Sequence, residues 1–195
     1  MKTNTRTKTI VGIGLFTAIV VVLQALAVAL RPTGLFSISL VLVPIVVGAA
    51  LYGAGAGAWL GFVFGVVVLI NDASAFMAIN IPGTVITCLL KGAMCGLLAG
   101  LVYRALAPKS GRLAVIVAAI VAPVTNTGIF LIGCYLFFFD TIKEWAAGAG
   151  YESAGAFLIL AMVGVNFLIE MAVNLVLSAA IVRIIKVGKH TLVEE

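Results

Sequence analysis

Long apolar segments separated by short polar stretches dominate the chain. Six such segments cover approximately residues 10–30, 36–52, 54–70, 81–106, 113–139 and 155–185. Each is at or near the ~17–25 residues that a helix needs to cross a bilayer, and the second and third are close to the lower limit. The glycine-rich "YGAGAGA" between these two predicts a tight turn. The apolar runs are continuous, whereas the strands of a membrane β-barrel alternate apolar and polar residues, so the pattern predicts six transmembrane helices.

Composition supports this interpretation. Of the 195 residues, 64% are hydrophobic and 10% are charged. A soluble domain of this size could not bury so much apolar surface, so lipid must act as part of the solvent. We therefore expect an all-α integral membrane protein, a compact bundle of six transmembrane helices that forms a single domain over residues 1–195.

The basic residues indicate how the bundle is oriented. They gather before the first span (Lys2, Arg6, Lys8), between the fourth and fifth (Arg104, Lys109, Arg112) and after the sixth (Arg183, Lys186, Lys189). The positive-inside rule then places both termini in the cytoplasm. Although the net charge is +5, the basic residues flank apolar segments and form no basic face with stacking aromatic residues, so we expect no nucleic-acid partner.

Residues 1–29 also have features of a secretory signal peptide: a basic start, an apolar run and a small-residue end at Ala25–Ala27. The apolar run is longer than the ~7–15 residues of a typical signal peptide. We therefore expect the first span to be retained.

Two charged residues fall inside predicted spans, Lys91 in the fourth and Glu170 in the sixth. A charge at the centre of a bilayer costs roughly 2.5–3.5 kcal/mol on insertion scales, so such a residue needs a partner, a cavity or a function. One interpretation is that Lys91 and Glu170 pair with each other. The other is that both face a hydrated pocket that admits a polar ligand.

Further polar residues share helical faces with these two. Their spacing of three or four residues places each set on one side of its helix. The sets are Thr84, Thr87 and Lys91 in the fourth span, and Asn166, Glu170 and Asn174 in the sixth. The fifth span contributes "PVTNTG", where we expect Pro123 to disrupt the helix beside Asn126. Polar faces on three helices favour one internal pocket.

Glycine ladders predict close helix packing. The third and fourth spans both contain GxxxGxxxG, at Gly57, Gly61 and Gly65 and at Gly92, Gly96 and Gly100. Such ladders let another helix approach closely, and we expect them to pack within the chain. Gly14 and Ala18 form a shorter small-xxx-small site in the first span, for which docking to another membrane subunit is an alternative.

Several kinds of chemistry are missing. His190 is the only histidine, which argues against HExxH zinc sites and Ser-His-Asp triads. No GxxxxGK[ST] phosphate-binding loop is present, so transport driven by ATP would need other subunits. Cys88, Cys95 and Cys134 lie in apolar runs, as packing residues do. We therefore expect no enzyme, no catalytic residue, no metal site and no cofactor.

The order of these features resembles the substrate-binding S component of energy-coupling-factor (ECF) vitamin transporters. The resemblance rests on "GIGLFTAIVVVLQALA", "FSISLVLVPIVVGAALYGAGAGAWLGFVFGVVVLI", "IPGTVITCLLKGAMCGLLAGLVYRAL" and "NFLIEMAVNLVLSAAIVRI". It implies a multi-pass protein of the bacterial cell membrane that binds a small vitamin. It also implies three partners, namely a transmembrane scaffold subunit and two cytoplasmic ATPase subunits.

The resemblance also implies roles for particular residues. Gly14 and Ala18 match the family's AxxxA contact with the scaffold, with glycine in place of the first alanine. The family's substrate site involves the fourth to sixth helices and the loops above them. The residues of this chain at those places are Lys91, Glu170, Asn126, Asn166, Thr87, Asn174 and Asn80.

The apolar segments look closest to pantothenate-type members, with riboflavin as the second candidate and Phe76 or Trp59 as its stacking partner. A different class of function is a self-contained ion-coupled carrier or small channel that uses Lys91 and Glu170 as a relay. A third interpretation is a membrane assembly partner that binds no ligand.

Overall fold

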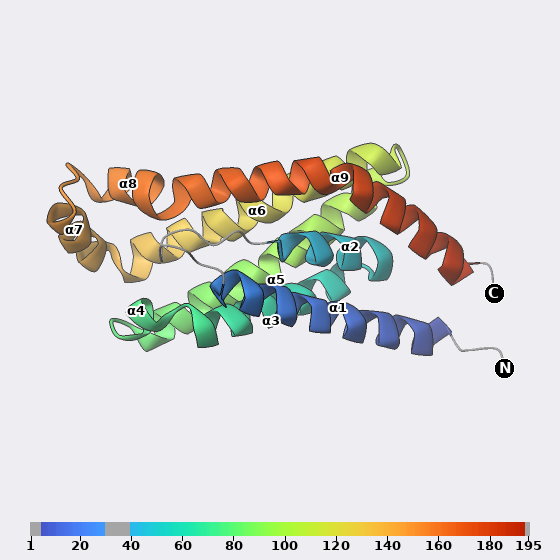
Figure 1. Cartoon of the computed structure of the whole chain (residues 1–195), viewed down its shortest axis with the longest axis horizontal. Coiled ribbons are helices and arrows are strands. Elements are labelled where there is room, and N and C mark those ends of the chain that lie inside the picture. Colours follow the sequence, from blue (N-terminus) through green and yellow to red (C-terminus); the bar gives the residue numbers. More distant parts are fainter. Residues whose placement is uncertain (1–4, 30–39, 194–195) are drawn as a thin grey trace.

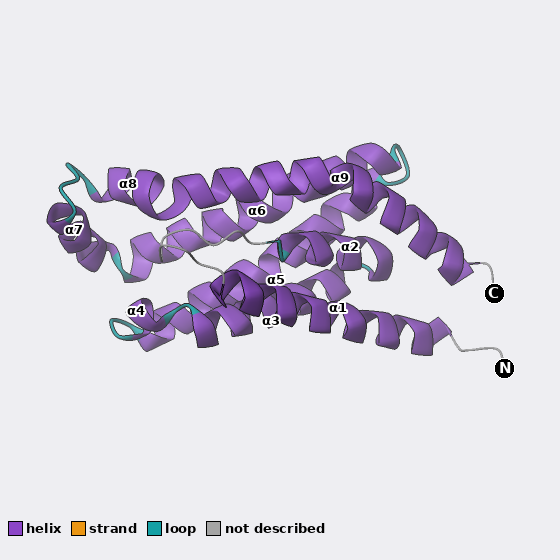
Figure 2. Cartoon of the chain, in the orientation of Figure 1, coloured by secondary structure: helices purple, strands orange, loops and turns teal. Residues whose placement is uncertain are grey.

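Helices make up the bundle seen in the computed structural model, which describes residues 5–29 and 40–193. The described part contains no strand (Figure 2). In chain order the elements are α1 (Thr5–Ala29), α2 (Leu42–Tyr52), α3 (Ala54–Asn71), α4 (Ser74–Met77), α5 (Ile81–Leu106), α6 (Gly111–Phe137), α7 (Phe139–Gly148), α8 (Ala154–Phe157), the π-helix η1 (Leu158–Val163) and α9 (Gly164–Val193).

Five helical stretches of the described chain are long and apolar enough to cross a membrane. They are α1, α3, α5, α6 and the continuous stretch that runs from α8 through η1 into α9. The predicted second span appears as the shorter apolar helix α2, and its predicted residues 36–39 lie outside the described ranges. The structure thus confirms an all-α membrane bundle.

The two ends of the bundle differ in charge. The start of α1, the turn between α5 and α6, and the last turns of α9 lie at one end (Figure 1), which we call the basic end because Arg104, Lys109 and Arg112 belong to it. The short helices α4 and α7 lie at the other end, called the α4–α7 end. The first and last described helices therefore begin and finish on the same side, as the positive-inside rule predicts for termini that are both cytoplasmic.

The two glycine ladders pack against each other, which confirms the prediction that they serve contacts within the chain. A methyl group added at Gly61 would meet the carbonyl oxygen of Gly92, and one added at Gly92 would meet that of Gly61. Gly57 and Gly96 face each other in the same way. The backbones of α3 and α5 therefore touch directly, which requires the absence of side chains at these positions.

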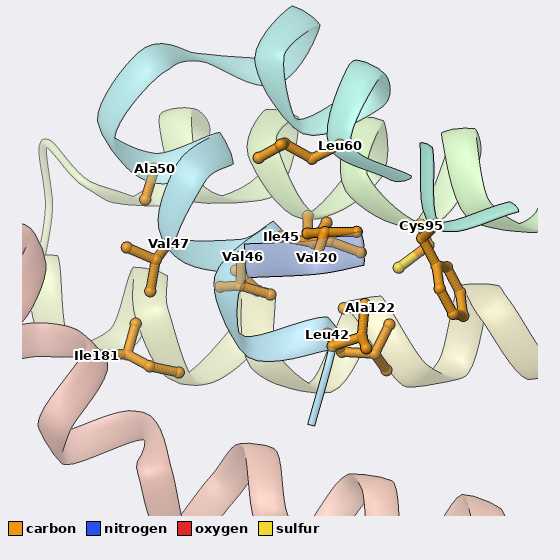
Figure 3. Packing of buried hydrophobic residues seen from close by; sticks show 14 of the residues in the cluster. Val20, Leu42, Ile45, Val46, Val47, Ala50, Leu60, Cys95, Ala122 and Ile181 are labelled. Atoms are coloured by element: carbon orange, nitrogen blue, oxygen red, sulfur yellow. The ribbon is translucent and has the colours of Figure 1, made fainter. Parts of the chain in front are cut away.

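Helix α2 lies in the interior of the bundle, in the half nearer the basic end (Figure 1). Its 11 residues span about 16 Å at 1.5 Å per residue, roughly half of a hydrocarbon core about 30 Å thick. Eight of them are buried. Figure 3 shows Ile45 and Val47 of α2 among Leu60 of α3 and Ile181 of α9. The shorter length is compatible with burial because α2 is covered by protein.

The turn between α2 and α3 is as tight as the sequence predicts. Gly53 alone separates the two helices and has φ of 96°, a conformation that favours glycine.

Two expectations need correction. Helix α6 continues through Pro123, so the predicted disruption does not end the helix there. Proline removes one backbone hydrogen bond, and the neighbouring helices that bury Pro123 hold the segment helical. The segment between the fifth and sixth predicted spans contains α7, for which the sequence analysis predicted no helix.

Candidate functional site

A cavity of about 350 Å³ lies between α3, α5, α6 and the η1–α9 stretch. A volume of this size is within the range of small-molecule sites. Four of the predicted site residues line it: Lys91, Asn126, Asn166 and Glu170. They come from α5, α6 and α9, so the structure brings together the three helices whose polar faces were predicted to meet.

Lys91 is half-buried and lies ten residues after the start of α5, about 15 Å along the helix axis. Its Nζ atom is 5.4 Å from the centroid of the Phe130 ring and 5.7 Å from that of Phe64. Aromatic faces attract a cation but do not neutralise its charge. The helix places Lys91 next to Gly92, whose contact with α3 fixes this part of α5.

Glu170 is buried and lines the same cavity. Within the described ranges, no ion pair joins its carboxylate to the Lys91 ammonium group. The interpretation that the two residues neutralise each other by direct contact therefore lacks support in this structure. Both side chains remain part of the cavity wall.

Asn126 adds an unsatisfied acceptor to this wall. It is 7% exposed, and its Oδ1 atom has no hydrogen-bond partner among the described residues. A buried acceptor without a partner costs about 1–3 kcal/mol. A donor group on a ligand would remove that cost.

The cavity wall on the side of the last span is shaped by the π-helix η1. Ala161, Met162 and Val163 lie in η1 and line the cavity, and α9 follows directly. Single turns of π-helix inside longer helices are frequent at functional sites because they change the register of the side chains that follow. Asn166 and Glu170 lie in the first turns of α9, just after this change.

Aromatic rings cover the cavity toward the α4–α7 end. Phe76 of α4 lines the cavity, and its ring centroid lies 5.9 Å from Phe130, 4.9 Å from Phe138 and 5.7 Å from Trp145. The cluster joins α4, α6 and α7 across this end of the bundle. These edge-to-face contacts each contribute about 0.5–1.5 kcal/mol beyond area burial.

Three predicted site residues lie outside the cavity lining. Thr87 is buried where α5 meets α6, and a methyl group added at Gly133 would meet its side chain. Asn174 is fully buried, and its Nδ2 atom donates to the Glu170 carbonyl oxygen at 2.8 Å. Asn80 caps α5, where its side chain accepts a hydrogen bond from the Gly83 N–H at 2.9 Å.

The sequence interpretation missed several residues that line the cavity, among them Asp72 and Phe130. Phe130 lies four residues after Asn126 and therefore on the same helical face, so spacing could have identified it. Asp72 follows directly after α3. The sequence signal that could have identified Asp72 as a site residue was its position, a carboxylate at the end of an apolar span.

No metal site is evident in the described ranges. There, no group of three His, Cys, Asp or Glu side chains gathers where a metal ion could be held. The three cysteines are free and buried, and Cys88 lines the cavity.

The small residues of α1 lie on an open face. Gly14 and Ala18 are exposed, and no atom lies within 4 Å of the position that a methyl group on Gly14 would take. Large apolar side chains surround them, including Val11 and Leu15, which are 65% and 61% exposed. Beside this face, Trp59 Nε1 of α3 donates to Thr17 Oγ1 at 3.2 Å and ties α1 to the bundle.

Comparison with known proteins identifies a family. The sequence model of the family described as "ECF transporter, substrate-specific component" matches residues 8–182. The matched range includes every residue that lines the cavity, as well as Gly14 and Ala18. Searches of curated proteins and of solved structures found no match.

Proposed function

Since the chain belongs to the family of ECF transporter substrate-specific components, we propose that its cavity beside Lys91 binds a small water-soluble vitamin, with pantothenate as the first candidate. Membership in the family implies a small-molecule substrate and, in general, partners that comprise a scaffold and ATPases. The protein is a multi-pass membrane protein, and we place it in the bacterial cell membrane.

The observation that carries this proposal is the position of the Lys91 ammonium group in the cavity wall without an ion-pair partner among the described residues. A charge removed from water is stabilised best by an opposite charge with good hydrogen-bond geometry. A ligand carboxylate would supply both, so an acidic vitamin fits the site.

The other polar groups of the wall suit the rest of such a ligand. Pantothenate carries two hydroxyl groups and an amide besides its carboxylate. The Asn126 Oδ1 atom would accept a hydrogen bond from a hydroxyl or amide donor, and the Glu170 and Asn166 side chains lie in the same wall. Hydrogen bonds that replace unsatisfied buried groups also give specificity, because a ligand without the matching donor leaves the acceptor unpaired.

Riboflavin fits less well. The cavity of about 350 Å³ is near the lower end of the range for small-molecule sites, which favours the smaller vitamin. Phe76 lines the cavity and could stack on a flavin ring, but Trp59 lies outside the lining, half-exposed and stacked on Phe62.

The second part of the proposed function is assembly with the scaffold subunit, and it concerns the exposed face of α1. We assign Gly14 and Ala18 to contact with the scaffold subunit, because small residues on an open helical face permit a second helix to approach closely. The chain has no phosphate-binding loop, so energy from ATP would enter through the partner subunits.

The test is a binding assay on the purified chain against a panel of vitamins that includes pantothenate and riboflavin. We expect pantothenate to bind with submicromolar affinity, and the absence of any vitamin that binds below micromolar concentration would overturn the proposal. Uptake into liposomes then separates the importer from a self-contained carrier. Concentrative uptake by the chain alone, driven by an ion gradient, would favour the carrier that uses Lys91 and Glu170.

A further inference from the structure

A second cavity, of about 730 Å³, lies at the basic end of the bundle and shares no residue with the first. It lies between the first turns of α6 and the last part of α9, and Tyr103 of α5 contributes to its wall. Figure 1 shows the turn between α5 and α6 beside α9 at this end. The proposed vitamin site gives this second cavity no role.

Three cations line the cavity: Arg112 of α6, and Arg183 and Lys186 of α9. Arg183 and Lys186 are three residues apart and therefore on the same helical face. All three are exposed, and none forms an ion pair with any carboxylate in the described part of the chain. No acidic residue of the described ranges belongs to the lining.

Apart from the hydroxyl groups of Tyr103 and Ser178, the rest of the wall is apolar. Val115 and Ile116 come from α6, and Val182 and Ile185 from α9. Val115 and Ile185 are buried, whereas Ile116 is 38% exposed and lies on the outer surface of a bundle that faces lipid. The cavity therefore combines a cationic rim with an apolar interior that continues toward the membrane.

We propose that this cavity binds an anionic phospholipid, with the phosphate between Arg112, Arg183 and Lys186 and the acyl chains against the apolar wall. Basic pockets between transmembrane helices on the cytoplasmic side suit anionic headgroups. The positive-inside rule puts this end of the bundle at the cytoplasmic surface. A free phosphate would gain nothing from the apolar wall, which is why a lipid fits better than a soluble anion.

The experiment compares lipids in mixed detergent micelles that contain the purified full chain. Phosphatidylglycerol, phosphatidylcholine or soluble glycerol phosphate is titrated in, and binding is measured by native mass spectrometry and by the shift of the unfolding midpoint. The test variant is R112Q/R183Q. The matched control is R104Q/K109Q, which removes two positive charges from exposed positions at the same end but outside the cavity.

We expect saturable binding of phosphatidylglycerol, weak binding of phosphatidylcholine and no comparable effect of glycerol phosphate. Each basic residue near a membrane surface contributes about fivefold in affinity, so R112Q/R183Q should bind phosphatidylglycerol roughly 30-fold more weakly. The control should lose much less. Circular dichroism and gel filtration establish that each variant is folded. If R112Q/R183Q does not fold, R183Q alone takes its place, with an expected fivefold loss of affinity.

Three results would overturn the proposal. Equal losses in the test and control variants would mean that only overall surface charge matters. Equal binding of both phospholipids would mean that the headgroup charge is not recognised. Saturable binding of glycerol phosphate with an affinity similar to that of the lipid would make the site one for a soluble anion. None of these results bears on vitamin binding at Lys91.

Discussion

The Lys91→Met variant tests the proposed recognition of a ligand carboxylate. Methionine keeps an unbranched apolar side chain of similar length and removes the ammonium group. A hydrogen bond to a charged group contributes about 1.5–3 kcal/mol, so pantothenate should bind about 10- to 150-fold more weakly. Stability should change little, because the variant loses the contacts with Phe64 and Phe130 but no longer holds a charge away from water.

Isothermal titration calorimetry with two ligands isolates the carboxylate. Pantothenol carries a hydroxymethyl group in place of the carboxylate of pantothenate, so its affinity should be nearly the same for the wild type and Lys91→Met. Lys143→Met is the control, because this exposed lysine pairs with Asp140 at 3.1 Å and lies outside the cavity. A loss below threefold for pantothenate, or an equal loss for pantothenol, would refute the assignment of Lys91 to the carboxylate.

Three further predictions concern packing, docking and the cavity wall. Gly61→Ala should destabilise the protein by about 1–3 kcal/mol, because the added methyl group meets the backbone of α5. Gly128 has open space around it, so the control Gly128→Ala should be neutral or stabilising. Thermal unfolding in detergent measures both changes. Gly14→Leu should abolish co-purification with scaffold and ATPase subunits and leave vitamin binding intact. Gly155 also has open space around it, so the control Gly155→Leu should preserve assembly. Loss of assembly in both variants would count against the α1 face as the docking surface. Asn126→Leu should raise the unfolding midpoint of the unliganded protein yet weaken pantothenate binding about 2- to 12-fold, and an unchanged affinity would remove Asn126 from the site.

Features that depend on local spacing were predictable from the sequence. The glycine ladders follow from small residues four apart, and the turn at Gly53 follows from glycine between two apolar runs. Lys91 and Glu170 stood out because a charge within an apolar span needs a cavity or a partner. These signals arise from helical geometry and the membrane environment, so they need no knowledge of the tertiary structure.

Features that depend on tertiary contacts were not predictable. Thr87 lies four residues before Lys91 on the same helical face, which suggested a common pocket. The close approach of Gly133 instead buries Thr87 between α5 and α6. The packing of Phe76 against Phe138 and Trp145 carries no polarity signal in an apolar chain, so this aromatic cluster beside the cavity was not evident. The register change in η1 depends on backbone hydrogen bonding, which residue spacing does not encode.

The burial of α2 bears on the order in which this protein is assembled during synthesis. A helix of about 16 Å cannot anchor itself across a bilayer on leaving the ribosome. The residues that cover it, such as Ile181 beside Val47, belong largely to helices made later, and α9 is made last (Figure 3). Contacts between such distant parts of a chain form late, because the intervening chain must first be ordered. The interior of the bundle is therefore completed after translation of the last helix, and until then α2 depends on the insertion machinery or on its neighbour α3.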